Sequence, residues 1–167
     1  KFEKETGIHV TVTDYDSNDT ALAKVSAGGH GYDLVVPSAH FVPIYVLPFA
    51  FALLACGLLG RNPTAVGQAG ALKHPEAARG ILRITPHPVM WAIMLWAGAH
   101  MLAVGSLRSV AFFAGLLLLA AAGTTLQDAR KAGALGEDWR RFAARTSNFP
   151  FGAILQGRNR LSWREIG

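Results

Sequence analysis

Residues 110–126 have the sequence Val-Ala-Phe-Phe-Ala-Gly-Leu-Leu-Leu-Leu-Ala-Ala-Ala-Gly-Thr-Thr-Leu, which contains no charged side chain. Two further uncharged runs precede this one, at residues 43–60 and 89–105. Each run approaches the roughly 20 residues that an α-helix needs to cross about 30 Å of hydrocarbon. A soluble protein that buried three such helices would need a larger polar shell than this chain provides. The sequence therefore predicts an all-α membrane protein with three transmembrane helices.

The composition changes near residue 42. Hydrophobic residues make up 51% of the chain and charged residues only 16%, whereas about 25% of a typical soluble chain is charged. Residues 1–42 hold three Lys/Arg and six Asp/Glu, and residues 43–167 hold thirteen and five. The arginines flank the apolar runs and do not cluster with aromatic side chains, which favours membrane topology over nucleic-acid binding. We therefore expect two segments, 1–42 and 43–167, with a lipid bilayer as the partner of the second.

The basic residues also predict the orientation of the spans. Lys and Arg are frequent in the loop 61–88 and in the tail after residue 126, whereas the connection 105–109 holds only Arg108. Because positive loops stay in the cytoplasm, we expect that loop and the C-terminal tail to be cytoplasmic. Residues 1–42 and the connection 105–109 are then expected outside, in the periplasm of a bacterium.

The tail contains a short amphipathic pattern at residues 136–145. Trp139 and Phe142 share one face of a helix, and the other face is basic. This pattern is typical of a helix that lies on the inner membrane surface, and a plain solvated helix is the alternative.

Residues 1–42 have the pattern of a soluble protein. Residues 8–13 alternate between β-branched and other side chains, and residues 32–36 form a short apolar run, so both are predicted strands. Asp19-Thr20 can cap a helix between them that ends near Ala27. The order is an incomplete β-α-β fragment, which is too small to bury a core of its own.

The candidate site residues lie on the second apolar run. Proline flanks His87 on both sides, which predicts extended backbone at His87 and a helix start at Pro88. His100 lies inside that helix, where an imidazole is a functional candidate by default. A structural hydrogen bond to a neighbouring helix is the open alternative. Trp96 precedes His100 by one turn and could pack on a flat cofactor, so His100, His87 and Trp96 are the candidate cofactor-binding residues.

The spacing of the two histidines limits how they can bind a metal. They are separated by about 20 Å along a straight helix, so they cannot both ligate one metal ion from that helix. A second ligand to a metal at His100 has to come from another helix, from a second copy in a homo-oligomer, or from sequence outside this chain. The pattern assigns no catalytic residue.

An ordered series of short motifs over residues 43–167 resembles the NnrU family. The motifs are Asn62-Pro-Thr64, Gly80-Ile-Leu-Arg-Ile-Thr-Pro-His-Pro88, Trp96-Ala-Gly-Ala-His100, Asp128-Ala-Arg130, Gly136-Glu-Asp-Trp139, Arg145-Thr-Ser147, Pro150-Phe151 and Gly157-Arg158. The family includes proteins of the bacterial inner membrane linked to denitrification, and it is related to the zeta-carotene isomerases.

The resemblance implies a cofactor and two lines of function. It implies haem b with His100 as a ligand of the iron, and either cis–trans isomerisation of an apolar substrate such as a carotenoid or a role in nitric oxide metabolism. The family usually has Arg-His-Pro where this chain has Pro86-His87-Pro88, which removes a cationic contact. It also begins with further helices that carry another haem-ligand histidine, so we expect a truncated member with weakened haem binding.

Two other readings remain open. The isoprenylcysteine carboxyl methyltransferases share the His-Pro helix start and the acidic-aromatic tail, and this resemblance implies S-adenosylmethionine near His87, Asp128, Glu137 and Trp139. Residues 1–42 are similar to the start of periplasmic polyamine-binding proteins. In the second reading the chain is an inactive fusion that carries a fragment of such a protein.

Overall fold

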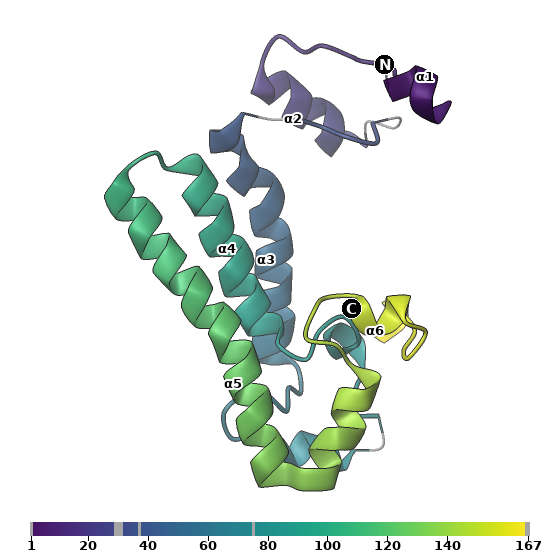
Figure 1. The fold of residues 1–167 in the computed structure, drawn as a ribbon, viewed down its shortest axis with the longest axis vertical. Helices are drawn as coiled ribbons and strands as arrows, with labels where there is room; N and C mark the ends of the chain where they lie inside the picture. Colours follow the sequence, from purple (N-terminus) through teal and green to yellow (C-terminus); the bar gives the residue numbers. More distant parts are fainter. Residues whose placement is uncertain (1, 29–31, 37, 75, 166–167) are drawn as a thin grey trace. The chain divides into compact units, whose positions relative to one another are not determined.

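The computed structural model describes residues 2–28, 32–36, 38–74 and 76–165. The chain divides into two compact units, Lys1–Phe41 and Val42–Gly167. Every regular element in the described part is helical (Figure 1).

The first unit contains the helices α1 (Phe2–Thr6) and α2 (Asn18–Ser26) and the 3₁₀ turn η1 (Ala39–Phe41). The cap of helix α2 is Ser17, two residues before the predicted cap at Asp19-Thr20, because the Ser17 hydroxyl accepts a hydrogen bond from Thr20 N at 3.2 Å.

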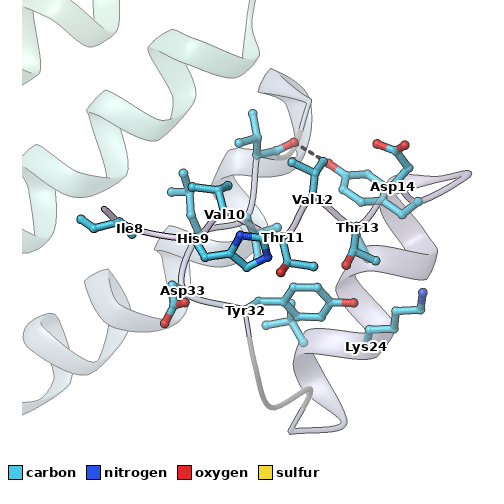
Figure 2. Close-up of a pocket in the computed structure, with 16 residues that line it drawn as sticks. Ile8, His9, Val10, Thr11, Val12, Thr13, Asp14, Lys24, Tyr32 and Asp33 are labelled. Carbon is cyan, nitrogen blue, oxygen red and sulfur yellow. Dashed lines mark hydrogen bonds between the residues drawn. The ribbon is translucent and has the colours of Figure 1, made fainter. Parts of the chain in front are cut away.

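The two predicted strands of this unit are wrong. Residues 8–13 and 32–36 form no β-ladder in the structure. The two segments instead line a hollow, whose side chains Figure 2 shows. Its volume is about 750 Å³. The Tyr15 hydroxyl, which donates to Val36 O, and Asn18, which bonds to Ser38, connect the ends of the two segments. A strand needs a partner backbone at about 5 Å, and the alternating pattern of one segment does not provide it.

The second unit contains three apolar helices, α3 (Val42–Leu59), α4 (Pro88–Ala103) and α5 (Leu107–Arg145). Helices α3 and α4 match the first two apolar runs within two residues, α5 contains the third run and continues well beyond it, and α4 begins at Pro88 as expected. Among the helices of the described residues, only α3 and α5 are long and apolar enough to cross a membrane. Helix α4 has 16 residues, or about 24 Å at 1.5 Å per residue, so the structure does not confirm a third span.

Helix α4 packs against both α3 and α5 (Figure 1). The contact with α3 is close because Gly57 has no side chain: a Cβ atom there would lie 2.9 Å from both Pro88 Cγ and Val89 Cγ2. Small residues of α4, including Ala92, Ala97 and Ala99, are buried. Such residues allow backbones to approach closely where lipid gives no hydrophobic driving force between helices.

A polar cap joins the C-terminal end of α3, the N-terminal end of α4 and the C-terminal part of α5. We define the cap as residues 61–87 and 137–165. It contains the 3₁₀ turns η2 (Ala69–Lys73) and η3 (Gly80–Arg83), the short helix α6 (Gly152–Leu155) and the 3₁₀ turn η4 (Trp163–Glu165). Its apolar core consists of Leu72, Ala78, Leu82, Trp139 and Phe142.

The cap core corrects the expectation for the amphipathic tail. Gly136 has φ 53° and ψ −120°, which interrupts α5 and redirects the last turns of helix. Trp139 and Phe142 are then 3% and 4% exposed, against residues of the loop between α3 and α4. The apolar face predicted to lie on the membrane is therefore buried inside the protein.

An ion pair closes the cap at its C-terminal end. Glu165 accepts from Arg83 Nε at 2.9 Å and Arg83 Nη2 at 2.8 Å, and also from Gly80 N at 3.0 Å. The hydrogen bonds from Arg83 and Gly80 lower the pKa of Glu165 from 4.5 to about 2. The pair raises the pKa of Arg83 in turn.

This ion pair predicts a loss of stability in acid. Because the folded-state pKa of Glu165 is depressed, its contribution is present above pH 4.5 and is lost as the pH falls towards 2. Thermal unfolding in detergent should show that the midpoint temperature falls more between pH 6 and pH 3 in the parent than in Glu165→Gln. Glu137→Gln is the control, because the Glu137–Arg140 pair is about 70% exposed on both sides. An equal drop in parent and Glu165→Gln would contradict the prediction.

Candidate functional site

His100 lies in the last turn of α4, and its ring orientation is set by its own helix. Its Nδ1 atom lies 2.8 Å from the carbonyl oxygen of Trp96. Since a carbonyl only accepts, Nδ1 donates this bond, and in the neutral imidazole Nε2 then keeps its lone pair. This is the tautomer that a histidine uses to ligate a metal through Nε2.

Two aromatic rings flank the His100 imidazole. The ring centroids of Trp96 and Phe113 lie 4.9 Å and 5.0 Å from it, and they lie 5.3 Å from each other. We call Trp96, His100 and Phe113 the aromatic triad. Trp96 is 37% exposed, so the triad reaches the apolar surface of the helices. Trp96 was expected beside His100, whereas Phe113 was not, because it comes from α5.

His87 lies at the opposite end of α4 and is almost completely buried. Its Nε2 atom lies 2.8 Å from Asp128 Oδ1, on α5. Its Nδ1 atom is buried and has no hydrogen-bond partner among the residues that the structure describes. Since α4 is continuous from Pro88, the two histidines are about 20 Å apart and do not form one site.

A hydrogen-bond network surrounds the His87–Asp128 pair. The Asn148 carbonyl accepts from Trp91 Nε1 at 2.8 Å and from the Thr85 hydroxyl at 3.2 Å. The Asn148 amide donates to the Thr124 hydroxyl at 2.9 Å. The network joins the start of α4, the middle of α5 and the loop after α5. Sequence reasoning missed Thr124 and Asn148, because their partners lie far away in the chain.

The residues of the methyltransferase reading are not gathered into one site by contacts. His87 and Asp128 are bonded directly. Glu137, in contrast, pairs with Arg140 at the surface, and Trp139 packs against Phe142 in the cap core.

The described residues contain no group of three or more His, Cys, Asp or Glu side chains that could hold a metal ion. A metal at the aromatic triad would therefore be held by the chain through one imidazole, which is sufficient for the proximal side of a haem. The apolar rings beside His100 suit a flat macrocycle, whereas the buried His87 offers no surface to one.

Comparison with known proteins gives two kinds of relative. The family model for NnrU protein matches residues 22–163. The chloroplastic 15-cis-zeta-carotene isomerases of Arabidopsis thaliana and Zea mays are both 39% identical over 82 residues, or 49% of this chain and 22% of theirs. The putrescine-binding periplasmic protein SpuD of Pseudomonas aeruginosa is 57% identical over 42 residues, or 25% of this chain and 11% of its own.

These matches decide the family. No solved structure is significantly similar to the chain. The chain spans about a fifth of the length of the isomerases, so their activity is not transferred by identity alone. The family model nevertheless covers most of the chain, and two of the helices are long and apolar enough to cross a membrane. The chain belongs to the NnrU family, as its motifs indicated.

Proposed function

We propose that the chain is part of a membrane-embedded isomerase of the zeta-carotene isomerase type, with haem b held by His100. The observation that carries the proposal is the aromatic triad. The half-buried His100 ring is held through Nδ1 by Trp96 O at 2.8 Å, so that in the neutral imidazole Nε2 is free to ligate a metal. The isomerase relatives are named for cis–trans chemistry on a carotenoid, which supports the same reaction class here.

The residues of the triad have separate roles in this proposal. Bound haem would supply a redox-sensitive iron centre near the double bond. The backbone carbonyl of Trp96 orients the imidazole, and the rings of Trp96 and Phe113 offer apolar surface to a polyene, which has no polar group to recognise. The surrounding α4 and α5 side chains are apolar, which excludes water from the substrate.

The proposal includes a location. Basic residues are concentrated in the cap, which contains the connection from α3 to α4 and the chain from residue 137 onward, whereas the connection between α4 and α5 holds only Arg108. By the positive-inside rule the cap faces the cytoplasm of a bacterium and the protein lies in its inner membrane.

Absorption spectroscopy tests the haem site. The full chain, purified in detergent after expression with haem supplied, is expected to show a Soret band that His100→Ala abolishes. His74→Ala is the matched control, because His74 is an exposed histidine of the cap. A Soret band of equal strength in parent and His100→Ala would place the haem elsewhere, and no band in any variant would contradict haem binding.

The isomerase activity needs its own assay. Haem-loaded parent in lipid vesicles that contain a cis-carotenoid should convert it to the trans isomer, detected by its changed absorption spectrum. The His100→Ala vesicles are expected to match protein-free vesicles. Haem binding without conversion would leave the cofactor proposal standing and contradict the substrate class.

A further inference from the structure

A hollow lies where α3 ends and the cap begins. It consists of two adjoining cavities of about 640 Å³ and 570 Å³, which share Arg61, Ala71 and His74 in their linings. One wall is apolar and belongs to the last two turns of α3, where Ala55, Cys56 and Leu59 line the larger cavity. The hollow therefore combines an apolar wall with a polar floor.

Three permanent cations line this hollow: Arg61, Lys73 and Arg79. All three are exposed, and within the part of the chain that the structure describes none of them forms an ion pair. Two carboxylates also line it, but Glu165 is already neutralised by Arg83. The three cations outnumber the remaining carboxylate, Glu76, so the hollow carries a net positive charge.

The position of the hollow along α3 identifies its occupant. The uncharged helix α3 ends at Leu59, and Arg61 follows within two residues. If α3 spans the hydrocarbon, Arg61 lies at the depth of the lipid phosphates. We propose that the hollow binds the phosphate-bearing headgroup of an anionic membrane phospholipid, whose acyl chain lies along the apolar wall of α3.

Both halves of the lipid are needed to explain the hollow. Clustered cations beside a membrane helix attract anionic headgroups. Each cation strengthens the association of the anionic lipid about fivefold. A free phosphate ion would use the cations but would leave the Ala55–Leu59 side of the cavity without a partner. The inference depends on membrane insertion and is independent of the haem at His100.

Lipid competition in proteoliposomes tests the proposal. The full chain is reconstituted in phosphatidylcholine vesicles, and the association of spin-labelled phosphatidylglycerol is compared with that of spin-labelled phosphatidylcholine. We expect the parent to prefer phosphatidylglycerol, and Arg61→Gln/Arg79→Gln to lose at least about fivefold of that preference. The control Arg130→Gln/Arg160→Gln removes two exposed arginines that do not line the hollow, and should keep the preference.

The outcomes separate the alternatives. Absence of a preference in the parent, or an equal loss in the control variant, would overturn the proposal. Loss of the parent's preference on adding inorganic phosphate, but not sodium chloride of equal ionic strength, would assign the hollow to a small soluble anion instead. A second variant, Lys73→Gln, removes one cation on an exposed turn and should lower the preference even if the double variant does not fold.

Discussion

Replacement of Asp128 by alanine is expected to lower the free energy of unfolding by about 2–3 kcal/mol, because a buried polar group that loses its hydrogen-bond partner costs about that much. The Asp128 carboxylate is the partner of His87 Nε2 at 2.8 Å, and within the described part of the chain His87 Nδ1 has no partner. The variant would leave a buried imidazole with both nitrogens unpaired. Equilibrium unfolding in mixed detergent, followed by circular dichroism, measures the loss.

Two variants show whether the hydrogen bond is the cause. Asp128→Asn keeps an oxygen acceptor at the same position, so its free energy of unfolding should fall by less than about 1 kcal/mol. His87→Leu/Asp128→Ala removes both partners and should recover much of the loss of the single alanine variant. If the asparagine variant were as unstable as the alanine variant, the charge of Asp128 rather than its hydrogen bond would be the stabilising feature.

The change from Gly57 to leucine is expected to destabilise the helices by about 3 kcal/mol, at the upper end of the cost of overpacking. A Cβ atom at Gly57 would lie 2.9 Å from Pro88 Cγ and from Val89 Cγ2. Neither atom can move cheaply, because one belongs to a rigid ring and the other to a β-branched side chain. Helix α3 would have to move away from the start of α4.

Gly115 provides the matched comparison. It is also a helical glycine, on α5, and a Cβ atom there would have no neighbour within 4 Å. Gly115→Leu should therefore be neutral or slightly stabilising, since leucine favours a helix more than glycine does. Thermal unfolding in detergent measures both variants. A similar loss at the two positions would show that the Gly57 contact does not determine the stability.

The helices of the second unit could be predicted because a single local property decides them. Uncharged runs marked α3, α4 and α5, and Pro88 marked the start of α4. The surface against which the Trp139 and Phe142 face packs could not be predicted in the same way. Lipid and protein core are equally apolar, so periodicity shows that a face is buried without showing against what.

The candidate site was predictable only within one helix. Trp96 and His100 are one turn apart on α4, so their contact follows from the helical repeat. The bond from His87 to Asp128 spans 41 positions in the sequence and depends on how α4 and α5 pack. The strands predicted at residues 8–13 and 32–36 failed for a related reason, because a ladder belongs to two segments and neither one encodes its partner.

The cap core also sets an order for biosynthesis. Leu72 and Leu82 leave the ribosome well before Trp139 and Phe142, which cover them in the finished protein. Glu165, the partner of Arg83, is synthesised later still, 82 positions further along the sequence. The loop between α3 and α4 therefore stays exposed throughout translation of α4 and α5. A nascent chain that stalls before Trp139 therefore lacks the two aromatic side chains that cover Leu72 and Leu82 in the folded protein.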